Sequence, residues 1–501
     1  MMKFTNKIII DINERYKTLW ALNHLTALAS WDMQTYMPED GINARSEALS
    51  KISVLGQKLF LDKEFVNLIG LAEKEKNLNE YETAIVRVLK RELKYYQKLP
   101  PKFIEEFSRV TSKAHLAWKE AKEKKNFSIF EPYLEKIVEL SRKKAEYLGY
   151  KKHPYDALLD LYEEGLTTDE VQRYFDSIKN PLISLVKKIK NSKNYKSEVQ
   201  LEKEKYDAKK MSAFDQKLLK LIHGNANNLR IDFAPHPFSI SLGEGDNRIT
   251  TRHFGIDFAE AFGSVVHEFG HALYEMQIAK ELKMTPLGSL SSLTIHESQS
   301  RFWEKMIGLS KEFILLVQKD ISELSPGMKK YSVDDIYRYF NLVKPSLIRT
   351  GADEVTYHLH VLIRFEIEKA LIEGTIKVKD LPKIWNEKYG QYLGISPKND
   401  ADGVLQDIQW SGGDIGYFPT YSLGTALSAI WKNQMEKDIG IISDLLKKTD
   451  GIGKIKKWLG ENIHQYGSTY TYNQLAKKIS GEEFSSKPLL DYLNKKYSKI
   501  Y

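Results

Sequence analysis

The stretch EAFGSVVHEFGHALYEMQ (260–277) limits the possible folds of this chain more than any other. Its apolar side chains recur around most of a helical circumference, so it predicts a helix that is buried on nearly all sides. Such a helix still carries His267, Glu268 and His271, and buried polar groups need partners because their desolvation is costly. The two histidines lie one turn apart on one helix face and can reach the same ion. The sequence therefore predicts a metal site, with Glu268 placed to hold a water and take its proton.

A catalytic metal takes three protein ligands, and the chain has no cysteine, so histidine and carboxylate must supply them all. The next suitable stretch is SSLTIHESQSRFWEKM (291–306), which we expect to form the next helix. Glu297 is the favoured third ligand, and the adjacent His296 is the alternative. If Glu297 binds the metal, His296 supports the ligands or contacts a substrate. Gly270 costs about 1 kcal/mol in mid-helix, which the close approach of another backbone or of a substrate would explain.

Most of the remaining chain has helical periodicity, so the expected fold is mostly α. Apolar residues recur at spacings of three and four in residues 81–95, 101–124, 129–148 and 167–191. The exception is 231–254, where FSISL alternates apolar and polar residues, GEGD is typical of a turn, and NRITTRHF is rich in β-branched residues. This stretch predicts a β-hairpin directly before the helix at 260–277. A strand beside the metal site could pair with an extended peptide.

Composition excludes several classes of protein. The net charge of 75 − 67 = +8 comes from lysines spread among glutamates, which indicates solvated helix faces rather than a nucleic-acid surface. The chain contains no run of about 20 apolar residues, so we expect no membrane span. The three isoleucines near the N-terminus are too few for a signal peptide. We therefore expect a cytoplasmic protein that binds neither nucleic acid nor membranes.

Beyond these patterns, the chain resembles the Taq-type metallocarboxypeptidases. The family's motifs occur here in order: HPF (236–238), D-x-R-x-T (246–250), H-E-x-x-H with H-E-S-Q (267–271 and 296–299), I-R-x-x-A-D (348–353) and GVLQDIQW (403–410). Two earlier stretches, SWDMQTYMP (30–38) and YDALLDLYEEG (155–165), are also similar to that family. The chain departs from the family at Gln409, where the last motif has histidine, and glutamine cannot titrate.

The resemblance implies a large helical metallopeptidase body with a long central cleft and a small β-hairpin or sheet beside the metal-site helix. It implies one metallocarboxypeptidase domain over residues 1–501, with or without two lobes flanking the cleft. It also implies one divalent metal ion per chain, with zinc expected and cobalt as the other option. The expected substrates are peptides with a free C-terminus, from which single amino acids are removed, and the expected assembly is a homodimer.

The mechanism assigns a role to several residues. Glu268 would act as the general base and pass the proton to the leaving amine. Tyr421, with Tyr417 behind it, is one candidate to stabilise the developing oxyanion, and simple aromatic packing is the alternative for both. His236 is another candidate, either for the oxyanion or for substrate binding.

A carboxypeptidase must also recognise a free α-carboxylate, which the planar fork of arginine matches. Arg349 lies in the apolar run SLIRTGAD and is the predicted carboxylate ligand, unless Asp353 is only its structural partner. Arg248, on the predicted hairpin, would bind substrate or limit its length. Two other functions stay open: an oligopeptidase or dipeptidyl carboxypeptidase of the same architecture, and a metal-binding protein without catalysis.

Overall fold

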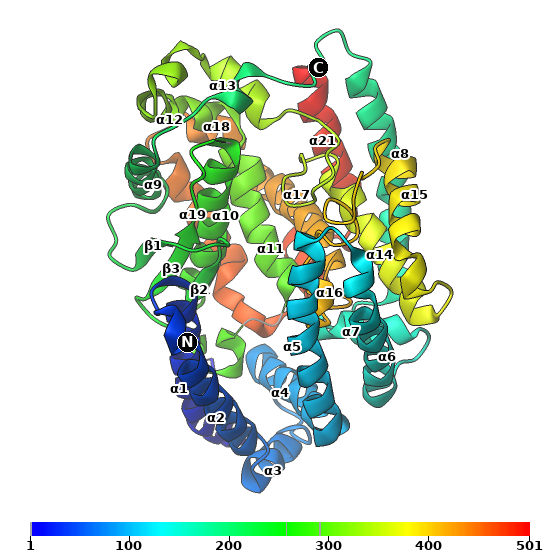
Figure 1. Cartoon of the computed structure of the whole chain (residues 1–501). Helices are drawn as coiled ribbons and strands as arrows, with labels where there is room; N and C mark the ends of the chain where they lie inside the picture. The colour runs from blue at the N-terminus through cyan, green and yellow to red at the C-terminus, as the bar shows by residue number, and fades with distance from the viewer. Residues whose placement is uncertain (1–2, 257, 290–291) are drawn as a thin grey trace. The chain divides into compact units, whose positions relative to one another are not determined.

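The computed structural model describes residues 3–256, 258–289 and 292–501 (Figure 1). The chain forms two compact units, each assembled from segments that are distant in the sequence. Unit 1 takes its residues from 1–96, 198–340 and 430–483, and unit 2 takes its residues from 97–197, 341–429 and 484–501. Ser291, which opens the predicted helical stretch 291–306, lies outside the described residues. In the described part of the chain, every helix is too short or too polar to cross a bilayer.

Unit 1 is helical apart from one small sheet, as the sequence predicts. Its helices are α1 (Lys7–Thr35), α2 (Ile42–Phe60), α3 (Lys63–Ala72), most of α4 (Glu80–Lys98), α9 (Ala208–His223), α10 (Phe258–Gln277), α11 (Leu293–Arg301), α12 (Lys311–Glu323), α13 (Val333–Phe340), the second half of α17 (Pro419–Ile439), α18 (Ile442–Leu446), α19 (Gly451–Asn462) and α20 (Tyr472–Ser480). A π-helical segment, Phe302–Gly308, follows α11 directly.

Unit 2 contains only helices and connections in its described residues. Its helices are α5 (Pro101–Glu123), α6 (Glu131–Leu148), α7 (Pro154–Tyr162), α8 (Thr168–Lys190), α14 (Tyr357–Glu373), α15 (Leu381–Leu393), α16 (Gln409–Gly412), the first half of α17 and α21 (Lys487–Ile500). The predicted helical stretch 167–191 is confirmed as α8, and Thr167 and Glu170 form a capping box at its start.

Short 3₁₀ turns join many of these helices. They span Glu39–Gly41, Phe127–Ile129, Gln200–Lys203, Lys280–Leu282, Pro286–Gly288, Pro326–Lys330, Val378–Asp380 and His464–Thr469.

The sheet of unit 1 has the order β1-β3-β2. The predicted hairpin is confirmed: β2 (Ser239–Ser241) pairs antiparallel with β3 (Asn247–Thr251), with Ile240 opposite Arg248. Strand β1 (Leu229–Phe233) pairs in parallel with β3 and was not predicted, although LRIDF alternates apolar and polar residues. Because β3 is the central strand, the outer edges of the described sheet belong to β1 and β2, and a peptide that paired with this sheet would have to add there.

Helix α10 is the buried helix that the sequence predicts. Phe262 packs against Phe340 with ring centroids 4.9 Å apart, and Phe269 packs edge-on against Trp303 at 4.9 Å. The helix contacts both the sheet and α11, and Figure 1 shows α10 and α11 side by side. The helix that carries the H-E-x-x-H motif therefore packs against other elements of unit 1 on several sides.

Candidate metal centre

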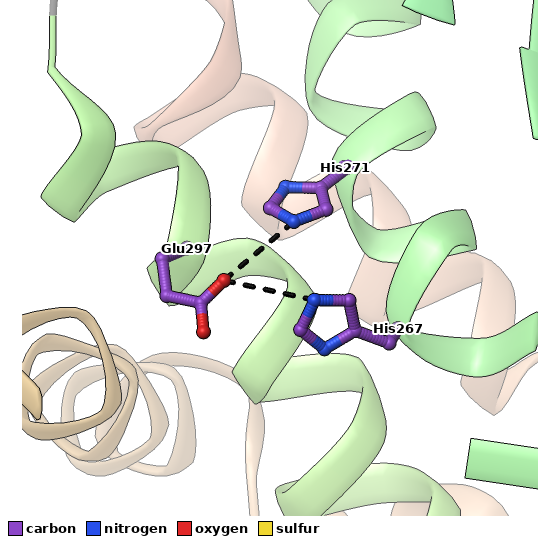
Figure 2. A group of neighbouring side chains, drawn as sticks. All are labelled: His267, His271 and Glu297. Atoms are coloured by element: carbon purple, nitrogen blue, oxygen red, sulfur yellow. Dashed lines mark ion pairs between the residues drawn. The ribbon is translucent and has the colours of Figure 1, made fainter. Parts of the chain in front are cut away.

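Three side chains from α10 and α11 converge in unit 1. His267, His271 and Glu297 each offer a ligand atom, and these atoms lie within 4.8 Å of one another (Figure 2). Nε2 of each histidine lies 3.6 Å from Oε2 of Glu297. This separation is long for a hydrogen bond but close to the roughly 3.3–3.4 Å between ligands that bind a tetrahedral ion at about 2.0–2.1 Å. The donor set and its spacing therefore fit a divalent cation.

Gly270 explains how α11 comes close enough to supply Glu297. A Cβ at this position would lie 2.5 Å from the carbonyl oxygen of Gln299 and 2.6 Å from Cα of Ser300. Real Cβ atoms are not found that close to backbone atoms, so any larger residue would push the two helices apart. Of the two explanations considered for this glycine, the close approach of another backbone is the one observed.

Contacts with other protein groups orient the candidate ligands His267 and Glu297. Nδ1 of His267 lies 2.9 Å from Oε2 of Glu304, which also accepts a hydrogen bond from Arg301 at 3.2 Å. Glu297 accepts hydrogen bonds through Oε1 from Arg301 (2.8 Å) and through Oε2 from the hydroxyl of Ser300 (2.9 Å). These contacts orient the ligand atoms before any ion binds.

Glu268 lies between the two histidines in the sequence and is buried. Burial raises the pKa of its carboxyl to about 7, although the neighbouring His267 opposes the shift. Among the described residues, its carboxylate has no hydrogen-bond partner. A carboxylate that is uncommitted and has a pKa near neutrality can both take and return a proton.

The burial of His271 favours the form of imidazole that binds metals. Desolvation and the nearby His296 lower its pKa well below the ordinary value. His271 is therefore neutral at physiological pH and can offer the lone pair of Nε2.

The predicted substrate residues of the sheet region lie in different surroundings. Arg248 on β3 donates from Nε and Nη2 to the two oxygens of Asp246, each at 2.8 Å, and its Cζ lies 4.3 Å from the ring centroid of Trp31. His236 is exposed on the connection between β1 and β2. Trp31, from the stretch SWDMQTYMP, thus stacks on the guanidinium that the sequence analysis selected.

Arg349 belongs to a buried polar network in unit 2. It donates from Nε to Asp407 at 2.9 Å and from Nη1 to the hydroxyl of Tyr357 at 3.3 Å. Asp407 also accepts from Nε of the fully buried Arg364 at 2.8 Å. Burial would raise the pKa of Asp407, but the charges of Arg364 and Arg349 outweigh that effect and lower it. Within the described residues, Nη2 of Arg349 makes no hydrogen bond, which leaves the end of the fork for another group.

Asp353 is not the structural partner of Arg349, so that alternative is wrong. Its carboxylate accepts hydrogen bonds from the backbone amides of Lys344, Val355 and Thr356 and from the Thr356 hydroxyl. These contacts fix the turn before α14. Asp353 therefore has a structural role of its own that does not involve an ion pair with Arg349.

Tyr421 lies beside Arg349, with the guanidinium Cζ 4.9 Å from its ring centroid. Its hydroxyl accepts a hydrogen bond of 3.4 Å from Nε2 of Gln409, and its ring packs against Tyr417 at 5.1 Å. The two tyrosines are packed together and half-buried, so both the catalytic and the packing interpretation stay open.

Comparison with known proteins identifies the family. The model of the carboxypeptidase Taq (M32) metallopeptidases matches residues 11–497. Thermostable carboxypeptidase 1 of Pyrococcus furiosus is 45% identical over 495 residues, covering 99% of both chains, and carboxypeptidase 1 of Bacillus subtilis is 40% identical over 477 residues, covering 95% of both. The solved structure of Pyrococcus furiosus carboxypeptidase has a TM-score of 0.95, with 45% identity and 99% of both chains covered.

The chain belongs to the M32 metallocarboxypeptidase family. It is therefore a peptide hydrolase, and membership implies a divalent metal ion. The solved structure of the M32 carboxypeptidase from Deinococcus radiodurans also matches, with a TM-score of 0.94 at 30% identity over 99% of this chain and 100% of that one. The mostly helical M32 fold with a small sheet is confirmed.

Several residues around the candidate metal site and around Arg349 were not predicted from the sequence. They are Glu304, Arg301, Glu275, Arg364 and Tyr357. Glu304 carried a detectable signal, because it lies seven residues after Glu297 and so on nearly the same face of one continuous helix. Arg364 carried none, since its partner Asp407 is 43 residues away in the sequence.

Proposed function

We propose that this protein is a zinc-dependent exopeptidase that removes single amino acids from the C-terminus of peptides. The convergence of His267, His271 and Glu297, with an uncommitted Glu268 between the histidines, is the observation that carries the proposal. The two nitrogens and one oxygen suit zinc, and cobalt accepts the same ligands. A bound divalent ion would polarise the scissile carbonyl and make a water molecule acidic enough to attack it.

The residues of the chain perform the remaining steps. Glu268 takes the proton of the attacking water and returns it to the nitrogen of the leaving amino acid. The Tyr421 hydroxyl donates a hydrogen bond to the oxygen that becomes negative, and His236 is the second candidate for this contact or for binding substrate.

The C-terminal carboxylate binds to Arg349 in this proposal. Because Nε of Arg349 is bound to Asp407, the carboxylate would meet the Nη1/Nη2 end of the fork rather than its Nε side. Arg248 contributes to binding the rest of the peptide through its one uncommitted nitrogen, Nη1, because Asp246 holds the other two.

Mass spectrometry of an N-terminally blocked peptide over time tests the proposal. We expect a ladder that loses one C-terminal residue per step, no cleavage of the C-terminally amidated peptide, and no activity after treatment with phenanthroline until zinc or cobalt is added. Dipeptide products or internal fragments would instead favour the dipeptidyl carboxypeptidase or oligopeptidase alternative. Stoichiometric metal without hydrolysis would leave a metal-binding protein.

A further inference from the structure

His296 has both ring nitrogens engaged by the protein. Its Nδ1 makes a hydrogen-bond contact with Nδ1 of His271, and its Nε2 lies 3.0 Å from Oε1 of Glu275. The edge of the Tyr274 ring packs against its ring at 5.2 Å between centroids. An imidazole has only these two polar atoms, so His296 has no free nitrogen for a substrate or for a metal ion.

The positions of the protons along this chain of contacts follow from the metal site. Nε2 of His271 faces Glu297, so a neutral His271 that binds a cation through Nε2 carries its proton on Nδ1. That Nδ1–H can only donate to Nδ1 of His296, which must then be unprotonated. The proton of a neutral His296 is consequently on Nε2 and is donated to Glu275. Each link has one donor and one acceptor.

We propose that His296 and Glu275 are positioning residues that fix the tautomer and the ring orientation of His271, through a relay that runs from His271 to His296 to Glu275. The proposal rests on the metal site of the proposed function. Of the three roles left open for His296, which were metal ligand, support of the ligands and substrate contact, it selects support of the ligands.

The two histidine ligands are thus held in different ways. Nδ1 of His267 meets the carboxylate of Glu304 directly, and Lys305 and Arg301 bind the same carboxylate group. Nδ1 of His271 meets a neutral imidazole, and the carboxylate of Glu275 lies one link further away. A carboxylate in direct contact makes an imidazole a stronger ligand than a neutral acceptor does. We therefore expect His267 to depend on Glu304 for basicity, and His271 to depend on His296 mainly for orientation.

Metal affinity of purified variants tests the relay without any peptide. His296→Leu removes the acceptor, and His296→Asn keeps an acceptor oxygen near the position of Nδ1 while losing the link to Glu275. We expect the dissociation constant for zinc, measured by competition with a chromogenic chelator, to rise about 10- to 100-fold in His296→Leu. In His296→Asn and in Glu275→Gln, the dissociation constant for zinc should rise by less than a third of that factor. Melting temperatures of the metal-free variants confirm that each is folded, and Glu304→Gln is the matched variant for the other histidine.

Two results would overturn the relay. Wild-type zinc affinity in His296→Leu, with only KM raised for peptides, would make His296 a substrate contact. An equal loss of zinc affinity in His296→Leu and His296→Asn would make His296 a metal ligand. The acceptor oxygen of asparagine would then restore none of the lost affinity. Failure of the exopeptidase proposal is read separately, from the product ladder of the wild-type protein.

Discussion

Helices α10 and α14 pose the same physical problem and solve it differently. Most residues of each helix are buried, and the buried residues include polar side chains. On α14, His360, Arg364 and Glu368 form one stripe at a spacing of four, and each meets a specific side chain: Tyr389 at 3.0 Å, Asp407 at 2.8 Å and Tyr155 at 2.6 Å. On α10, the Nε2 atoms of His267 and His271 point instead toward Glu297 at a separation suited to a shared ion.

The difference shows what separates a structural polar network from a reactive one. The α14 network pairs Arg364 with Asp407 and gives Glu368 hydrogen-bond donors from Tyr155 and Trp410, so most of its polar atoms are satisfied within unit 2. The α10 network directs Nε2 of two histidines and a carboxylate oxygen at one point, and leaves Glu268 uncommitted beside them. Buried polar groups that lack hydrogen-bond or ion-pair partners are costly unless something else satisfies them, and at α10 a bound divalent cation would do so.

The largest expected effect concerns catalysis at α10. Glu268→Gln removes the base but keeps the size of the side chain, so we expect kcat to fall about 10²- to 10⁴-fold. Metal content, measured by elemental analysis, should stay at the wild-type level because Glu268 is not among the three converging ligands. Activity within a few-fold of the wild type would show that the base is another residue.

The corresponding change in unit 2 should affect stability. Asp407→Asn leaves Arg349 and Arg364 buried without their carboxylate, and we expect the free energy of unfolding to drop by about 3–5 kcal/mol. Urea unfolding measures the loss. Asp491→Asn on α21, which breaks an exposed pair with Lys487, should cost no more than about 0.5 kcal/mol. A small loss at Asp407 would mean that the α14 network contributes little to folding.

The same carboxylate gives a pH test with a definite sign. Because its two arginines lower the pKa of Asp407 below the ordinary 3.8, its contribution is fully present above that value and is lost as the pH falls through the folded-state pKa. The stability difference between wild type and Asp407→Asn should therefore be constant near neutral pH and shrink below about pH 4. A difference that grows on acidification would contradict this assignment.

Sequence patterns predict the α10 site and only part of the α14 network, for a physical reason. Two histidines four residues apart on one helix share a face by geometry. The third ligand had to be chosen between two neighbours on the next helix, Glu297 and His296. Arg364 and Asp407 meet only because the chain returns over 43 residues, and Glu368 meets Tyr155 across 213. Periodicity describes faces of single elements, so it predicted the helices and the β2–β3 hairpin. It did not predict the parallel partner β1 or which carboxylate Arg349 would bind.

Substrate recognition in unit 2 should show an intermediate effect. Arg349→Lys keeps a positive charge near Asp407 but loses the flat end of the fork, so we expect KM for free-carboxyl peptides to rise about 10- to 100-fold, with a smaller change in kcat. Steady-state kinetics with a series of C-terminal residues measures the effect. If KM stays at the wild-type value, Arg349 is a structural member of the network alone.

The contact between α10 and α11 allows a smaller test with a matched control. Gly270→Ala forces a Cβ against the backbone of Gln299, so we expect a loss of about 1–3 kcal/mol and weaker zinc binding as Glu297 moves away. Gly56→Ala on α2, where nothing lies within 4 Å of the added Cβ, should stabilise the protein by up to about 1 kcal/mol. Thermal unfolding of both variants measures these effects. Equal shifts in melting temperature would mean that α10 and α11 accommodate the added Cβ at no cost.

The smallest effect is expected at Gln409, which lies beside Tyr421 in unit 2 and has one polar atom unsatisfied within the described part of the chain. Its Nε2 donates to Tyr421, while its Oε1 is buried without a partner among the described residues. Gln409→His puts a titratable group of pKa near 6.5 beside Tyr421, and protonation near the charge of Arg349 is unfavourable. We expect kcat/KM within about 3-fold of wild type at pH 8, where the imidazole is neutral, and an additional loss as the pH falls below about 6.5. Gln409→Leu, which cannot titrate, should give a ratio to wild type that does not change with pH. If the ratio of kcat/KM to the wild-type value does not change with pH in either variant, Tyr421 packs in unit 2 and takes no part in catalysis.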